Sequence, residues 1–314
     1  MSDNAHRQPR PTGQDENADG AIANVVPGSN VILCADDFGL TPAVSRGIAE
    51  LAKAQRLSAT SAIVTMPDWL EQAAALAGLR SYLATGLHLN LTLGAPLGPM
   101  RRLAPDGELP DSAGIVRKSL SLSLDSPEIE AEIERQLERF EAGVGHPPDF
   151  IDGHQHVHAL PGVRNALFKV LARRFPSAKP LVRDPADTMR AILARKSAMP
   201  KAAAISALSR GFGTRARVAG FPTNHGFSGY SAFDTERTYA SELENFFAMR
   251  GPRHLVMCHP GYVDDALAEL DPVVERRRQE FDALFSLPHL DTAIWHVRRP
   301  ADGVCVNWEQ ALPA

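Results

Sequence analysis

From residue 31 onward the chain alternates short apolar runs with longer amphipathic segments. Strands are expected at 31–35, 61–66, 84–93, 179–183, 254–258 and 293–295, with another ending at 150–152, and helices at 41–55, 69–79, 125–142, 163–175 and 271–285. Thr41 and Asp125 or Ser126 are placed to cap their helices. This order predicts a mainly parallel sheet, as a β/α barrel first and an open doubly wound sheet second.

Composition sets the domain organisation. Residues 1–29 are rich in Asn, Asp, Gly, Pro and Gln and predict a disordered tail, whereas 30–314 are expected to form a single domain. A 44% hydrophobic content supports a full core, and no run is long enough for a transmembrane segment. The tail has no secretory apolar region, which favours a cytoplasmic protein. A net charge of −4 argues against nucleic acid as a partner, and three cysteines argue against a disulfide framework.

Polar residues gather where the predicted strands end. The positions are Asp36 and Asp37, then His88, then Asp152, His154, His156 and His158, and finally His259. Neighbours on a strand point to opposite faces, so Asp36 and Asp37 are expected to face apart, and the three alternating histidines to share one strand face. In β/α barrels the carboxyl ends of the strands meet at one opening, so these groups are expected to converge there.

Asp and His together suit Zn²⁺, Mn²⁺ or Mg²⁺, and two histidines with one carboxylate are typical of a hydrolytic metal site. Each group also has an ordinary structural interpretation. His88 could be a hydrogen-bonded core residue, the acidic pair a helix-capping turn, and the histidine run a surface feature. Because all these polar groups fall at the ends of predicted strands, the metal site is the favoured interpretation.

Four motifs occur in the order CADDFGLT, GLHLNLT, DGHQHVH and VMCHPGY. Together they resemble the YdjC-like family of carbohydrate deacetylases over roughly 31–290. The resemblance implies a distorted (β/α) TIM-like barrel of the polysaccharide-deacetylase kind. It also implies a metal-dependent hydrolase that removes acetyl groups from N-acetylated amino sugars, as oligosaccharides or sugar-bearing lipids.

By the same resemblance, Asp37, His88 and His154 are the ligands of one divalent metal ion, Mg²⁺ or Zn²⁺, although His156 and His158 stay open as ligands. Asp36 matches the general base and His259 the catalytic histidine that protonates the leaving amine. Arg183 is expected to orient a catalytic carboxylate. Gln155 departs from the pattern, because relatives often have a further histidine there.

Two regions bear on substrate choice. Residues 188–233 contain no Asp or Glu and carry Arg190, Arg195, Lys196, Lys201, Arg210, Arg215 and Arg217. They are either a solvated pair of basic helices or a cap over the barrel opening that attracts an anionic or lipid-linked glycan. Within them, a glycine-rich loop presents Asn224, His225, Phe227 and Tyr230, which either bind a sugar or only fill the loop.

The function expected is therefore removal of an acetyl group from an acetylated amino-sugar substrate. A metal-dependent phosphoesterase on a similar barrel is the first alternative, and an inactive sugar-binding protein is the second. A homodimer is left open.

Overall fold

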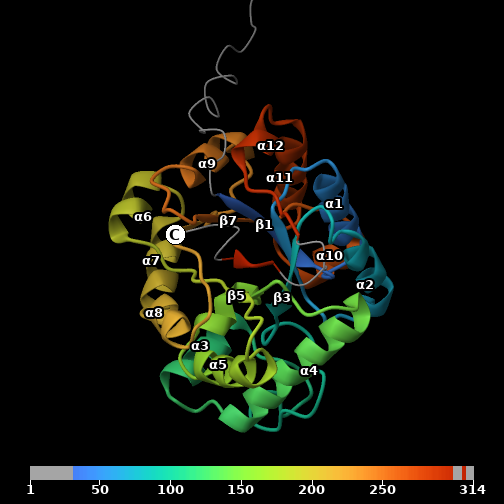
Figure 1. Cartoon of the computed structure of the whole chain (residues 1–314), viewed down its shortest axis with the longest axis vertical. Coiled ribbons are helices and arrows are strands. Elements are labelled where there is room, and N and C mark those ends of the chain that lie inside the picture. Colours follow the sequence, from blue (N-terminus) through green and yellow to red (C-terminus); the bar gives the residue numbers. More distant parts are fainter. Residues whose placement is uncertain (1–30, 300–305, 309–314) are drawn as a thin grey trace, which may run out of the picture.

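Seven short parallel strands form the sheet of this computed structural model, which describes residues 31–299 and 306–308 (Figure 1). They are β1 (Ile32–Phe38), β2 (Ala59–Ala62), β3 (Ala84–Leu89), β4 (Phe150–Gly153), β5 (Leu181–Val182), β6 (Phe227–Ser228) and β7 (Leu255–Cys258). Their spatial order is β5-β4-β3-β2-β1-β7-β6. The first strand thus pairs with both the second and the last, as in a barrel opened between β5 and β6. Even there, Val182 N donates a hydrogen bond to Pro222 O at 2.9 Å. The barrel prediction is confirmed, and the doubly wound alternative is wrong.

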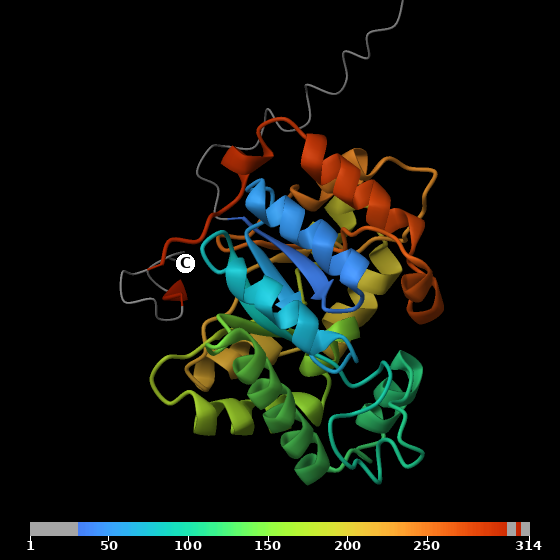
Figure 2. The ribbon, with the colours of Figure 1, turned by 90° about the vertical axis from the view of Figure 1, so that its right-hand side faces the viewer.

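Helices surround this curled sheet. They are α1 (Pro42–Lys53), α2 (Trp69–Gly78), α3 (Ser112–Leu120), α4 (Ser126–Val144), α5 (Val163–Arg174), α6 (Met189–Arg195), α7 (Met199–Leu208), α8 (Phe212–Val218), α9 (Tyr239–Phe246), α10 (Asp265–Leu270), α11 (Glu275–Ser286) and α12 (Leu290–Ala293), with a 3₁₀ helix η1 (His154–Ala159). In Figure 2, α11, α1, α2 and α4 lie side by side over the outside of the sheet. No helix within 31–299 or 306–308 is long and apolar enough to cross a lipid bilayer.

The predicted caps hold two of these helices in place. Thr41 Oγ1 accepts a hydrogen bond from Val44 N at the start of α1, and Asp125 does the same for Glu128 N at the start of α4. Each satisfies a backbone donor that the first helical turn leaves free. The expected apolar face of α4 is buried, at Ile129, Ile133, Leu137 and Phe140.

Strand alternation divides the core into two parts. On β1, Ile32 and Cys34 belong to an inner cluster that fills the barrel, whereas Leu33 and Ala35 belong to the larger outer cluster beneath the helices. Trp308 joins the inner cluster, and its indole N–H donates to Asp149 O at 2.7 Å. The inner positions at the carboxyl ends of the strands are then left for polar side chains.

Several element predictions need correction. The second strand is Ala59–Ala62 rather than 61–66, because its hydrogen-bonded register with β1 and β3 begins at Ala59. No strand forms at 293–295. Helix α12 ends at Ala293, and Trp295 N donates a hydrogen bond to Val31 O outside any strand ladder. The basic segment forms three helices, α6 to α8, instead of two. The predicted tail, 1–29, lies outside the described residues.

Candidate metal centre and active site

A β-bulge in β1 aims the two aspartates. Ala35 pairs with Thr60 and Phe38 with Ala62, so β1 uses one residue more than β2 over this interval. The irregularity coincides with Asp37, whose φ of 69° is left-handed. Bulges of this kind occur beside active sites and redirect a side chain. Asp36 points into the barrel, as Cys34 does, and Asp37 turns toward the same group of polar side chains. The expectation that the two face apart therefore does not hold.

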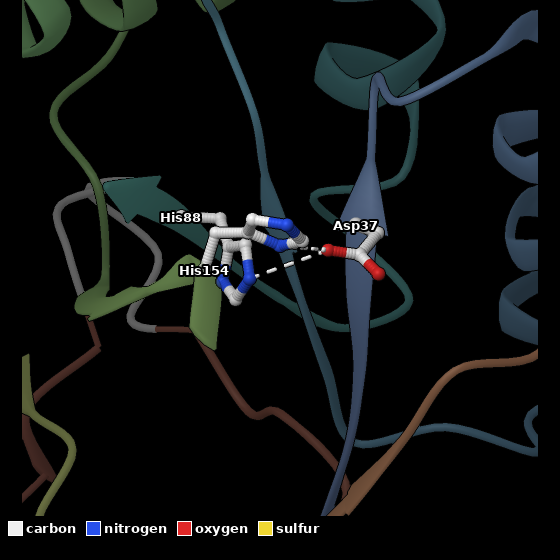
Figure 3. A group of neighbouring side chains, drawn as sticks. All are labelled: Asp37, His88 and His154. Atoms are coloured by element: carbon white, nitrogen blue, oxygen red, sulfur yellow. Dashed lines mark hydrogen bonds and ion pairs between the residues drawn. The ribbon is translucent and has the colours of Figure 1, made fainter. Parts of the chain in front are cut away.

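Asp37, His88 and His154 come together at the ends of β1, β3 and β4. Asp37 Oδ1 lies 3.0 Å from His154 Nδ1 and 3.3 Å from His88 Nε2, and Figure 3 shows both rings turned toward this one oxygen. The three donor atoms all lie within 4.8 Å of one another. Ligands about 2.0–2.2 Å from a tetrahedral ion stand roughly 3.4 Å apart. The donor types and their spacing therefore fit a divalent cation.

Asp152 fixes the orientation of His88. Its Oδ1 accepts a hydrogen bond from His88 Nδ1 at 2.7 Å, and Ser61 Oγ lies 3.0 Å from the same nitrogen. This leaves Nε2 to face Asp37, an arrangement common for metal-binding histidines. Burial alone would lower the pKa of His88, but Asp152 and Asp36 outweigh it and raise the pKa to about 10. The pocket around this ring attracts positive charge.

Arg183 holds Asp36 from the far side of the barrel. Its Nη1 and Nη2 donate to the two carboxylate oxygens of Asp36 at 2.7 and 2.6 Å, and Nη2 also pairs with Asp152 Oδ2. The guanidinium group is fully buried. Cys34, Asp36 and Asp152 are a second group with metal-ligand atoms, but Arg183 contacts all three residues and supplies the positive charge there.

A second arginine, Arg277 on α11, pairs with the other side of Asp37. Its Nη2 lies 2.7 Å from Asp37 Oδ2 and 2.7 Å from Asp271 Oδ2. The connected network now contains four carboxylates, on Asp36, Asp37, Asp152 and Asp271, and two guanidinium groups. Taken without the histidines, these groups carry a formal charge of −2, which one divalent cation would balance once His88 has lost its proton as a ligand. Nothing in the sequence distinguishes buried Arg277 from its exposed neighbour Arg278, so this residue was missed.

The three histidines of the HQHVH run do not share a strand face. The segment forms η1, with Gln155 and His156 at positive φ, because β4 ends at Gly153. His154 therefore faces Asp37, whereas His156 packs edge-on against the rings of Phe227 and Tyr230. His158 Nε2 lies 2.8 Å from the carbonyl oxygen of Arg183. Of these three side chains, only His154 lies in the metal-type group.

His259 follows β7 and is held through its backbone. Its N–H donates to Glu280 Oε2 at 2.6 Å. Burial lowers the pKa of His259 to about 4, although the negative charges of Asp37 and Asp36 oppose this shift. Burial also raises the pKa of Glu280, to about 7. His259 is therefore a neutral imidazole at pH 7, close to both aspartates.

The residues predicted to bind sugar lie mostly in the interior. The amide of Asn224 is used within the protein, accepting from Asp184 N and donating to Asp184 O and Gly226 O. Phe227 is fully buried, and Tyr230 donates its hydroxyl to Pro185 O at 2.6 Å. Backbone atoms of His225 pair with Arg253. None of the four belongs to the metal-type group, and Phe227 and Tyr230 reach the site only through His156.

Phe233, the last residue of the same loop, contacts the site instead. Its ring packs edge-on against the ring of His259, with centroids 5.5 Å apart. On α7, Lys201 places its Nζ 4.5 Å from the Phe233 centroid, and it has no ion-pair partner among the described residues. The backbone of Phe233 is left-handed, with φ 57°, and its N–H donates to Ser231 Oγ. Sequence reasoning missed Phe233 because only the fold brings it to His259.

Comparison with known proteins identifies the family. The sequence model of a family described as YdjC-like protein matches residues 30–291. The chain belongs to the YdjC-like family. This YdjC-like chain is 31% identical over 266 residues to a chitooligosaccharide deacetylase of Enterobacter sp. (strain 638), covering 84% of this chain and 93% of that protein. It is 32% identical over 237 residues to a chitooligosaccharide deacetylase of Klebsiella pneumoniae, covering 74% and 82%.

One further relative and one solved structure extend the comparison. A human carbohydrate deacetylase is 39% identical over 142 residues, which is 44% of the YdjC-like chain and only 43% of the human protein. A solved structure from Enterococcus faecalis V583, described provisionally as a cellobiose-phosphate cleavage protein, has a TM-score of 0.63 at 22% identity. The match covers 90% of this chain and 98% of that one, and at this identity it shows a shared fold.

Proposed function

We propose that this YdjC-like protein removes the acetyl group from an N-acetylated amino sugar with the help of one divalent cation. The observation that carries the proposal is the convergence of Asp37, His88 and His154 beside the Asp36–Arg183 pair. The Enterobacter and Klebsiella relatives, aligned over most of their length, support the choice of reaction. Cytoplasmic residence, the identity of the metal and a homodimer stay predictions.

In this proposal Asp37, His88 and His154 hold the cation. The chemistry that it supplies when bound is polarisation of the acetyl carbonyl and acidification of a water molecule. Asp36 accepts the proton of the attacking water, and Arg183 keeps its carboxylate in one orientation through two hydrogen bonds. Arg183 is thus a positioning residue for the base.

His259 is proposed to protonate the amine that leaves. Because the ring is neutral in the free protein, it must first take up a proton from solvent, and it does so as negative charge develops beside it during water attack. Proton delivery is thereby coupled to the reaction, and Glu280 keeps the His259 backbone in place. Without this proton the amine would have to depart as an anion.

On the substrate side we propose that Phe233 and Lys201 flank the acetylated sugar. Phe233 touches the ring of His259, and Lys201 offers unpaired donors close by. The interior contacts of Asn224, Phe227 and Tyr230 favour a supporting role behind His156 rather than sugar contact. Arg195 on α6 is buried and bonded to Asp187 and Phe227 O, so it is not free to attract a substrate. Within residues 188–233 we therefore propose only α7 as the cap over the barrel opening.

Acetate release tests the proposal against its alternatives. Purified protein would be offered acetylated chitooligosaccharides and phosphorylated sugars, before and after treatment with a chelator and after return of Mg²⁺ or Zn²⁺. We expect acetate release that the chelator abolishes and the metal restores. Phosphate release would favour the phosphoesterase, which commonly uses two metals. Sugar binding with neither product would indicate an inactive binding protein.

A further inference from the structure

Arg277 divides the two oxygens of Asp37 between two tasks. Oδ1 faces the rings of His88 and His154 at 3.3 and 3.0 Å, whereas Oδ2 accepts a hydrogen bond from Arg277 Nη2 at 2.7 Å. Arg277 is 1% exposed, so this contact lies away from solvent. A carboxylate can bind a cation through one oxygen or through both. Here one of the two oxygens is already occupied by the protein.

Arg277 is itself held at several points. The same Nη2 donates to Asp271 Oδ2 at 2.7 Å, and Nε donates to Val273 O at 3.0 Å. Asp271 is fixed in turn, because its Oδ1 accepts a hydrogen bond from Val273 N at 2.7 Å. The guanidinium group therefore cannot swing away from Asp37 without also breaking its ion pair with Asp271 and its hydrogen bond to Val273 O.

We propose that Arg277, anchored by Asp271, restricts Asp37 to one-oxygen binding of the cation and thereby keeps a coordination position free for water or the acetyl carbonyl. The inference rests on the proposed function, because it concerns the same cation. Catalytic metal sites combine three protein ligands with an open position. A second oxygen from Asp37 would take up that position. Arg277 is a positioning residue, since it acts through Asp37.

The variant that tests this is Arg277→Met, which keeps much of the length of the side chain and removes its charge and donors. Loss of the guanidinium group frees Asp37 Oδ2, so the Zn²⁺ affinity measured by calorimetry should be equal to that of the wild type or higher. The rate of acetate release at saturating Zn²⁺ should fall at least about tenfold, within the range of effects seen for residues that contact metal ligands. The visible absorption of bound Co²⁺ should also weaken, because its intensity drops as the coordination number rises.

Arg276→Met is the matched control. Arg276 is a buried arginine on the same helix, but its partners are Glu242, Gln279 and the Arg237 carbonyl. This variant should leave Zn²⁺ affinity and the Co²⁺ spectrum unchanged. If Arg277→Met does not fold, Asp271→Asn decides the matter, because it loosens the anchor of Arg277 and should change affinity and turnover in the same directions by smaller factors.

Two results would overturn the inference. One is Zn²⁺ binding at least tenfold weaker in Arg277→Met with activity restored by excess Zn²⁺, which would make Arg277 a support for the ligand. The other is unchanged turnover together with an unchanged Co²⁺ spectrum. Metal binding is measured without substrate, so a wild-type protein that binds Zn²⁺ but releases no acetate would overturn only the proposed function. A wild-type protein that binds no divalent cation would overturn both.

Discussion

Asp36 and Asp37 are adjacent residues, yet each is paired with a different arginine. Both oxygens of Asp36 are held by Arg183, whereas Asp37 gives one oxygen to Arg277 and the other to the histidines. Burial alone would raise the pKa of Asp37, but Arg277 and then His154 outweigh it and keep the pKa well below its usual range. Two identical side chains thus acquire different proposed roles, as base and as ligand, from their partners.

The role of Asp36 can be tested with Asp36→Asn. The amide keeps the shape of the side chain but cannot accept the proton of water, so turnover should fall by about 10²–10⁴-fold. Metal content, measured by elemental analysis, should equal that of the wild type, because Asp36 lies outside the Asp37, His88 and His154 group. Near-normal turnover would place the base elsewhere, with His259 as the next candidate.

At the scale of elements, the turn between β1 and α1 positions the bulged end of the strand. Gly39 has a φ of +87°, and a Cβ atom there would stand 2.6 Å from the Ile63 carbonyl oxygen. Ser45 Oγ on α1 also accepts a hydrogen bond from Gly39 N at 2.8 Å. The segments around β1, β2 and α1 approach one another so closely here that position 39 has no room for a side chain.

Gly39→Ala should therefore destabilise the protein more than Gly107→Ala. Gly107 has nearly the same φ, +86°, but nothing within 4 Å of its added Cβ. The left-handed backbone alone costs about 1–2 kcal/mol in each variant, and only Gly39→Ala adds a clash with backbone. Urea unfolding of both variants measures the difference. Equal losses of stability would show that the contact with Ile63 relaxes freely.

Helix α7 contributes one cation, Lys201, to the neighbourhood of His259. Lys201→Met should lower kcat/KM for an anionic amino sugar by roughly fivefold, equivalent to about 1 kcal/mol, and leave that for a neutral one nearly unchanged. Attraction of this kind is screened over about 8 Å at physiological ionic strength, so added salt should reduce the rate on the anionic sugar alone.

The control for Lys201→Met is Arg190→Met, which removes an exposed cation on α6. This variant should leave kcat/KM unchanged for both the anionic and the neutral amino sugar. An equal loss for both variants would indicate a general effect of net charge. Equal salt responses on the two sugars would contradict a role for Lys201 in attracting an anion.

At the scale of the whole molecule, buried histidines link folding to pH. Burial lowers the pKa of His158 and His259 to about 4 and that of His254 to about 3. At these three histidines the unfolded chain, with pKa values of about 6.5, binds more protons below that pH than the folded chain does. The free energy of unfolding should therefore fall as pH drops from about 6.5 toward 4. Glu280 and Asp184, whose pKa values burial raises to about 7 and about 6, act in the opposite direction between these values and their unfolded values of about 4.

His254→Gln isolates one of these contributions away from the proposed metal site. His254 Nδ1 accepts a hydrogen bond from Gly251 N and its Nε2 lies 2.8 Å from Ser228 Oγ, contacts that a neutral ring makes. The variant should reduce the pH slope of the unfolding free energy by up to about 1.4 kcal/mol per pH unit between pH 4 and 6. Urea unfolding at several pH values measures this slope. Parallel curves for variant and wild type would show that His254 does not titrate with unfolding.

The sequence by itself determined the features that depend on local chemistry and on strand order. The apolar period of α4, its Asp125 cap and the Thr41 cap of α1 are local, so they were predicted correctly. Polar residues at strand ends predicted that these clusters converge, because the carboxyl ends of parallel strands meet at one edge of a barrel. The resemblance to the YdjC-like family singled out Asp37, His88 and His154 among them, and the fold groups these three.

Tertiary structure decided how those residues are aimed and which partners they have. The left-handed bulge at Asp37 follows from the register of β1 against β2, which no local pattern encodes. Arg277 lies 240 positions from Asp37, and Arg183 lies 147 positions from Asp36, so these buried pairs form only when the curled sheet brings distant strands and helices together. Phe233 reaches His259 for the same reason. A charged or aromatic side chain looks alike in sequence whether it faces solvent or a buried carboxylate, and only the folded chain distinguishes the two.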